Sequence, residues 1–279
     1  MNNNHFICPI CRTKLSLSEN GRCLLCQKEE KPHCFDISSA GYVNLLTGHG
    51  GGGDSKECVK SRSAFLDSGH YAPISEKICE LLRNILRGEC VILDAGCGEG
   101  YYTSAISGAF PDSYTYGIDI SKPAVEYAAK RAKREGHDKN MYAVSSIFEL
   151  PIADDVLDCI TCIFAPCPEN EFRRVLNRNG MLIVASAGKN HLMGMKKAIY
   201  DTVYPNEERA DLPAASDFEL VAKETLSYTA ELKKKDDIAN LFSMTPYYYR
   251  TSLAGKERLL SLESLVTEVE VDFSIYRKI

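Results

Sequence analysis

From residue 91 onward, short apolar runs alternate with amphipathic segments. The apolar runs predict strands at 91–95, 115–119, 141–145, 157–164 and 181–187. Ser121 is placed to cap a helix that extends to about Arg134, between the second and third of these strands. Ser75 is placed to cap an earlier helix, whose apolar positions share one face: Ile78, Leu81, Leu82, Ile85 and Leu86. This alternation predicts an α/β fold, with a mainly parallel sheet covered by helices on both faces.

The pattern changes towards the C-terminus. Residues 219–232 and 267–276 carry apolar side chains at every second position, which predicts two antiparallel strands added to the parallel set. Helices are expected near 233–243 and 255–265, between these two strands.

Composition and charge narrow the class of protein. The 279 residues are 44% hydrophobic and 25% charged, as in an ordinary globular protein. There is no run of 18 or more apolar residues, so no membrane span is expected. The N-terminus has no basic region followed by an apolar stretch, so we expect a cytoplasmic protein. The net charge of −5 does not indicate nucleic-acid binding overall, so any such surface must be a local patch.

Two Cys-x-x-Cys pairs lie near the N-terminus. Cys8 and Cys11 form the first pair, and Cys23 and Cys26 form the second, eleven residues further on. Four thiolates at this spacing predict a structural zinc site, although His33 could replace one cysteine as the fourth ligand. Free thiols or a redox pair are the alternatives at this spacing.

The cysteine-rich segment and the glycines after it define the domain organisation. We expect a zinc module at 1–47, a glycine-rich linker at 48–60 and the main domain at 61–279.

A glycine-rich bend follows the strand at 91–95. Gly96, Gly98 and Gly100 predict a tight turn that a ligand can approach closely, and a helix should begin between Glu99 and Thr103. No Lys followed by Ser or Thr is present in this turn, which speaks against a triphosphate cradle.

Acidic residues around the bend indicate the charge of its ligand. Asp119 follows about 20 residues later, where a carboxylate binds ribose hydroxyls in doubly wound folds. Asp94 and Glu99 would repel the pyrophosphate of NAD but favour the sulfonium and ammonium of S-adenosylmethionine. The sequence therefore favours the methyl donor over NAD, and over a glycine turn that only closes a strand–helix corner.

At this point the motifs match a family. The chain resembles the RlmA group of 23S ribosomal RNA guanine-N1-methyltransferases, which are class I, S-adenosylmethionine-dependent methyltransferases. The matching segments run in the family's order over nearly the full length: the cysteine module, Phe35-Asp36, Gly41–Leu46, Ala64–Asp67, Gly69–Tyr71, Leu93–Thr103, Ala165–Cys167, His191–Met193 and Met244–Pro246. The resemblance implies a Rossmann-like, seven-stranded sheet whose last pair is antiparallel, beside a small zinc-ribbon-like module.

The resemblance also implies a reaction and a substrate. The family methylates N1 of one guanine in a hairpin loop of 23S rRNA, so this RNA is the expected partner. Tyr71, Gly98, Glu99 and His191 occupy matching motifs and are expected to contact the donor. The resemblance allows a homodimer. In the family the fourth zinc ligand is a histidine shortly after the third cysteine; here Cys26 intervenes and His33 lies further along.

Three residues are candidates for catalysis. His191 could take the N1 proton or contact the donor, and Phe164 could stack on the target base or lie in the core. Cys167 is the weaker candidate, because N1 has its own lone pair once it is deprotonated.

Several surface features are candidates for RNA contact. Residues 247–249 are three tyrosines, which could stack on bases or pack internally. Lysines and arginines at 130–134 and 196–197 could meet phosphates or form ordinary solvated helix faces.

Two other functions compete with rRNA methylation. One is methylation of a small molecule, with the zinc module purely structural. The other is a zinc-stabilised RNA-binding protein whose donor site is vestigial.

Overall fold

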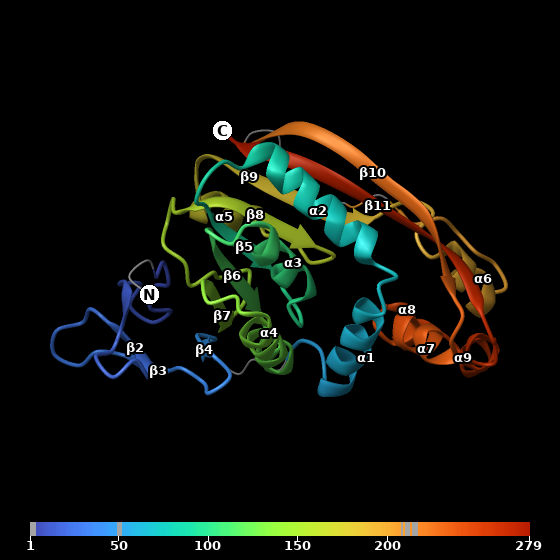
Figure 1. Ribbon diagram of the computed structural model, residues 1–279, viewed down its shortest axis with the longest axis horizontal. Coiled ribbons are helices and arrows are strands. Elements are labelled where there is room, and N and C mark those ends of the chain that lie inside the picture. The colour runs from blue at the N-terminus through green and yellow to red at the C-terminus, as the bar shows by residue number, and fades with distance from the viewer. Residues whose placement is uncertain (1–3, 49–51, 208, 210–212, 214–216) are drawn as a thin grey trace.

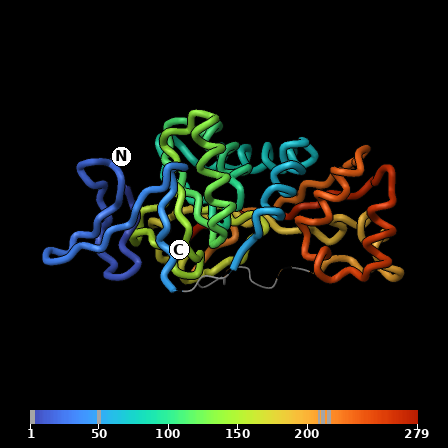
Figure 2. The backbone as a smooth tube through the Cα atoms, turned by 90° about the horizontal axis from the view of Figure 1, so that it is seen from below, coloured from blue at the N-terminus to red at the C-terminus, as the bar shows by residue number. Residues whose placement is uncertain are grey.

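The computed structural model describes residues 4–48, 52–207, 209, 213 and 217–279. In this part of the chain the strands form a three-stranded and an eight-stranded sheet. The small sheet belongs to the N-terminal module and consists of β1 (Leu15–Leu17), β2 (Cys23–Cys26) and β3 (Cys34–Asp36). Figures 1 and 2 show this module at one end of an elongated molecule.

Parallel strands form the centre of the large sheet. They are β5 (Val91–Ala95), β6 (Tyr114–Asp119), β7 (Asn140–Val144), β8 (Leu157–Ile163) and β9 (Leu176–Ala187), in the spatial order β9-β8-β5-β6-β7. The five predicted strands and the mainly parallel sheet are confirmed. The strand order reverses between β5 and β8, and ligands of open α/β sheets bind at the carboxyl ends of the strands at such a point.

Helices cover one face of this sheet. They are α2 (Ala72–Ile85), α3 (Tyr101–Ala109) and α4 (Lys122–Glu135). Ser121 caps α4, as predicted. The other face is covered by α5 (Glu169–Val175) together with the N-terminal module. The rings of Phe6 in the module and Tyr116 on β6 pack edge to face, with centroids 5.1 Å apart. The module is thus part of the packing of the large sheet.

The chain ends in a long antiparallel hairpin. β10 (Phe218–Leu232) pairs with β11 (Leu265–Lys278), and β11 pairs antiparallel with β9. Buried side chains alternate along β11 as the period of two predicts: Thr267, Val269, Val271, Phe273 and Ile275. Between the hairpin strands lie α7 (Lys235–Ser243), α8 (Tyr247–Arg250) and α9 (Leu253–Leu260), and α6 (Met193–Ile199) lies at the same end of the molecule (Figure 1).

The structure differs from the sequence-based expectations at the entry to the main domain. An eighth strand, β4 (Tyr42–Asn44), comes from the segment expected to belong to the zinc module and pairs parallel with β7. Helix α1 (Lys56–Asp67) begins inside the expected linker and is capped by Ser55. Residues 49–51 of the glycine tract lie outside the described residues.

Helix α2 also begins earlier than expected, at Ala72 rather than after Ser75. Pro73 lies in its first turn, where a residue without an N–H group costs no hydrogen bond. None of the described helices has the length and apolar character needed to cross a membrane.

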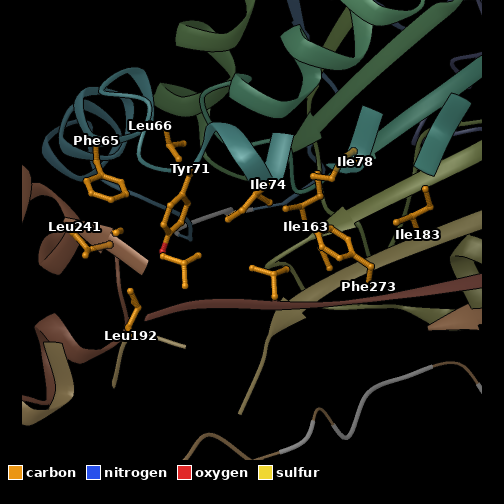
Figure 3. Packing of buried hydrophobic residues seen from close by; sticks show 14 of the residues in the cluster. Phe65, Leu66, Tyr71, Ile74, Ile78, Ile163, Ile183, Leu192, Leu241 and Phe273 are labelled. Atoms are coloured by element: carbon orange, nitrogen blue, oxygen red, sulfur yellow. The ribbon is translucent and has the colours of Figure 1, made fainter. Parts of the chain in front are cut away.

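A large apolar cluster supports the carboxyl end of the sheet. Figure 3 shows it joining α1 and α2 to β8, β9 and β11. The rings of Phe65 and Tyr71 meet edge to face in this cluster, with centroids 5.1 Å apart. Tyr71 is thereby held rigidly at the start of α2.

Candidate active site

The glycine-rich bend lies at the carboxyl end of β5. Gly96, Gly98 and Gly100 have φ angles of +77°, +54° and +79°, which glycine adopts without strain. A Cβ on Gly96 would lie 2.6 Å from Cβ of Ala165, and one on Gly100 would lie 2.7 Å from Cβ of Ala128. The glycines therefore permit both the sharp turn and the close approach of neighbouring segments.

A cavity of about 930 Å³ opens beside this bend. Cofactor sites typically occupy volumes of this order, so the cavity can hold a small donor and a nucleobase together. Most of the residues expected to bind the donor line it: Tyr71, Gly96, Gly98, Glu99, Asp119 and His191. Asp94 and Gly100 are not among its lining residues.

Asp94 lies behind the bend. Its carboxylate accepts hydrogen bonds from the hydroxyls of Thr103 (2.5 Å) and Thr161 (3.0 Å), and it is almost fully buried. Burial raises the pKa of Asp94 to about 6, against the opposing effect of the two hydroxyls. Asp94 thus ties the end of β5 to α3 and β8.

Asp119 fixes the shape of the bend from the end of β6. It accepts hydrogen bonds from the backbone N–H groups of Gly98 (3.0 Å) and Ser121 (2.8 Å). Because the side chain also lines the cavity, it is placed to receive ribose hydroxyls.

Glu99 carries an unsatisfied carboxylate oxygen inside the protein. The side chain is only 2% exposed, and its Oε2 has no hydrogen-bond partner among the residues that the structure describes. The nearest cation is Arg62, whose Nη1 lies 3.9 Å away and also pairs with Asp54. Burial raises the pKa of Glu99 to about 7, while Arg62 opposes the shift. A buried acceptor without a partner at a cavity wall fits a cationic ligand such as the methyl donor.

This burial has a consequence for stability. In the folded protein Glu99 binds its proton up to about pH 7, whereas the unfolded chain releases it near pH 4.5. The donor-free protein should therefore lose stability as the pH rises from 4.5 to 7. We expect Glu99→Gln to remove this loss, raising the unfolding free energy at pH 8 by on the order of 2 kcal/mol while weakening donor binding.

Urea unfolding at pH 5 and pH 8 measures this effect. Glu263→Gln is the control, because it changes an exposed carboxylate paired with Lys235. If Glu99→Gln changes the unfolding free energy equally at both pH values, the pH dependence does not come from Glu99.

Tyr71 and His191 form a pair in the wall of the cavity. The Tyr71 hydroxyl lies 3.3 Å from His191 Nε2, and His191 Nδ1 accepts the backbone N–H of Glu270 at 3.2 Å. The neutral ring must therefore carry its proton on Nε2 and donate it to the Tyr71 oxygen. Burial lowers the pKa of His191 to about 4. Both ring nitrogens are engaged, so this arrangement does not favour His191 as the acceptor of the N1 proton.

Phe164 and Cys167 have different environments. Phe164 has a φ of +51°, is 42% exposed and lines the cavity, so it does not lie in the core. Its ring is tilted against His191, with centroids 5.8 Å apart. Cys167 is buried and is not among the residues that line the cavity, which disfavours a role as nucleophile.

Each of the two basic clusters contains one buried residue, while Lys130, Lys133, Arg134 and Lys197 are exposed. Arg131 is buried and donates to Asp67 and Ser63. Lys196 is also buried, with its Nζ 2.6 Å from Asn206 Oδ1. A continuous basic strip for RNA phosphates is therefore not formed by these residues.

The three tyrosines at 247–249 have different environments, so stacking on bases and internal packing do not apply equally to all of them. Tyr247 lines the cavity, and Tyr249 is 76% exposed. Tyr248 packs edge to face against Phe242, with centroids 5.4 Å apart.

Sequence reasoning missed several cavity residues, among them Arg62, Asn206 and Glu207. They come from α1 and from the connection between α6 and β10. No spacing motif marks them, so the fold was needed to find them.

The N-terminal module contains a metal-binding group. The ligand atoms of Cys8, Cys11, Cys26 and His33 all lie within 4.8 Å of one another. His33 Nδ1 is 3.4 Å from Cys8 Sγ and 3.5 Å from Cys26 Sγ. Three thiols and one imidazole in this arrangement fit a tetrahedral zinc ion.

Cys23 lies outside this group, so the expected set of four cysteines is not the one that the fold assembles. Cys23 and Cys26 are the two ends of β2, and residues three apart on a strand point to opposite faces. Cys26 faces the group, whereas Cys23 interacts with Cys34 on β3. His33, the alternative ligand, takes the place of Cys23.

The sheet, bend and cavity define an S-adenosylmethionine-dependent methyltransferase, and residues 86–241 match the methyltransferase domain family. Residues 6–49 match the N-terminal zinc-ribbon region of RlmA. The chain belongs to the family of the 23S rRNA (guanine-N(1)-)-methyltransferases, as the following relatives show.

The 23S rRNA (guanine(748)-N(1))-methyltransferase of Streptomyces fradiae is 32% identical, over 86% of this chain and 84% of its own length. A Micromonospora griseorubida protein named for the 23S rRNA (guanine-N(1)-)-methyltransferase activity is 30% identical, over 94% of this chain and 93% of its own length. A Bacillus subtilis protein named for the same activity is 30% identical, over 98% of this chain and 97% of its own length.

Proposed function

We propose that this enzyme transfers the methyl group of S-adenosylmethionine to N1 of a guanine in 23S rRNA, and that this guanine lies in a hairpin loop. The observation that carries the proposal is the likeness to the named rRNA methyltransferases, which extends through both the zinc module and the catalytic domain. Loop bases are easier to unstack than paired bases, so a hairpin loop suits an enzyme that must enclose its target.

The cavity residues supply the binding functions that this reaction needs. Asp119 would hold the ribose of the donor, and Glu99 would face one of its cationic groups. Tyr71 and His191 would position the donor as a rigid pair. When bound, the donor supplies a methyl group on a positively charged sulfur, so the protein mainly has to align the two reactants and exclude water.

The target base would enter beside Phe164. The exposed ring of Phe164 offers a surface for stacking, and Ala165 and Pro166 continue the same wall of the cavity. The zinc module would help to grip the RNA hairpin outside the cavity.

Methylation mapping tests this proposal. Purified protein should methylate a 23S rRNA hairpin transcript at N1 of one guanine, and cells lacking the gene should lose that N1-methylguanine. If cells lacking the gene keep every N1-methylguanine of their 23S rRNA, the proposal is contradicted. A homodimer is a separate prediction, to be checked by sedimentation of the free protein and of its RNA complex.

A small-molecule substrate is the second candidate function. The net charge of −5 and the burial of Arg131 and Lys196 favour it, because both reduce the positive charge available to phosphates. RNA binding that weakens steeply with salt supports the rRNA substrate. Binding that does not respond to salt would favour the small molecule.

A further inference from the structure

We propose that Glu207 recognises the Watson–Crick edge of the target guanine and accepts its N1 proton. This inference rests on the proposed function and adds to it the residue that selects and deprotonates the base. Glu207 lines the substrate part of the cavity, together with Phe164, Pro166 and Tyr247. The other described carboxylates of the cavity, those of Asp54, Glu99 and Asp119, lie beside the glycine bend on the donor side.

The carboxylate of Glu207 is available for a ligand. The residue is exposed, and within the described part of the chain no hydrogen bond or ion pair engages its side chain. By contrast, Asp54 is paired with Arg62, and Asp119 accepts two backbone N–H groups. Glu99 is buried beside the glycine bend, with Arg62 Nη1 3.9 Å away. Since both ring nitrogens of His191 are also engaged, Glu207 is the described cavity base with free acceptor oxygens on the substrate side.

The neighbouring residue, Asn206, anchors the chain beside Glu207. The side-chain amide of Asn206 donates to the carbonyl oxygens of Gly188 (2.8 Å) and His191 (3.2 Å). Its Oδ1 accepts from Lys196 Nζ (2.6 Å) and from the Tyr247 hydroxyl (3.1 Å).

The backbone of Asn206 is fixed as well. Its N–H donates to Lys189 O at 2.9 Å. With its donors and acceptors used, Asn206 fastens the connection between α6 and β10 to the turn that carries His191. The backbone next to Glu207 is therefore anchored relative to the donor-binding pair by a partly buried network.

Guanine forms better hydrogen bonds to a carboxylate than the other bases do. Its N1–H and N2–H₂ groups are adjacent donors, which two carboxylate oxygens can accept side by side. Adenine and cytosine present an unprotonated ring nitrogen at the corresponding position, which a carboxylate repels. Uracil offers one N–H between two carbonyl oxygens, so only one of the two bonds can form.

The same contact places a base at the reacting atom. As N1 forms its bond to the methyl carbon, the carbon–sulfur bond breaks and its electron pair remains on sulfur. The N1 proton becomes acidic as the new bond forms and passes to the Glu207 carboxylate, which later releases it to water. The products are N1-methylguanine, S-adenosylhomocysteine and one proton, so atoms and charge balance.

A cycle of protein and RNA changes tests the assignment. Glu207→Gln keeps the size of the side chain but loses one acceptor and the base, and kcat/KM should fall by about 100-fold. Replacing the target guanine by inosine removes the 2-amino group. The kcat/KM of the wild-type enzyme should then fall by about tenfold. The kcat/KM of Glu207→Ala should fall much less, because this variant already lacks the carboxylate that accepts from the 2-amino group.

The controls separate this inference from the proposed function. Asp201→Asn changes an exposed carboxylate of the same connection, paired with Arg258, and should leave kcat/KM unchanged. Calorimetric donor binding that equals that of the wild type would show that both Glu207 variants are folded. Equal inosine penalties in wild type and Glu207→Ala, or full activity of Glu207→Gln, would overturn the role of Glu207. Failure of the wild-type enzyme to methylate the guanine would instead overturn the proposed function.

Discussion

Gly98→Val is expected to abolish binding of the methyl donor, lowering its affinity by more than about 1,000-fold. The substitution places a β-branched side chain at a φ of +54°, which only glycine adopts readily. Gly98 also lines the cavity, and its N–H donates to Asp119. A valine there would both fill space that the donor requires and disturb the carboxylate placed to receive ribose hydroxyls.

Titration calorimetry with S-adenosylmethionine measures this loss. Gly88→Val is the matched control, because Gly88 has a φ of +72° in the turn before β5, and a Cβ added there would meet nothing within 4 Å. It imposes comparable backbone strain away from the cavity. If Gly98→Val binds the donor as tightly as Gly88→Val does, the donor does not bind at the bend.

Cys26→Ser and His33→Ala are each expected to lose the bound zinc, whereas Cys23→Ser should retain it. Cys26 and His33 belong to the cluster around Cys8, and Cys23 faces the opposite side of β2. Structural zinc contributes about 10 kcal/mol or more to the folding of small modules, so its loss should unfold this one. Zinc content per chain and protease sensitivity of residues 4–48 measure the two effects.

The three variants together decide between the two ligand sets. Zinc loss in Cys23→Ser with zinc retained in His33→Ala would restore the set of four cysteines. Loss of the module should also destabilise the methyltransferase domain, because Phe6 and Leu15 pack with Tyr116 and Ile118 on one face of its sheet. Cys34→Ser, next to Cys23 on the face away from the group, controls for the removal of a thiol.

Much of the fold could be predicted from local sequence. The strands of the parallel sheet are short apolar runs, and β11 follows the period of two over most of its length, because each strand carries its burial pattern in its own residues. The bend could also be predicted, since three closely spaced glycines favour the left-handed backbone found at Gly96, Gly98 and Gly100. The family's motifs lie in the same local segments.

Other features depend on which segments the fold brings together. The spacing of Cys23 and Cys26 suggested a pair of ligands, but an extended strand turns residues three apart to opposite faces, and the β2–β3 pairing brings His33 into the site. Strand β4 forms through pairing with β7, which lies far away in the sequence. Glu207 and Arg62 reach one cavity from distant segments without any motif. By itself the sequence determined the sheet, the bend and the donor's charge. Only the tertiary structure brought His33 to the cysteine cluster and Glu207 to the cavity, because both placements depend on contacts that no local sequence pattern specifies.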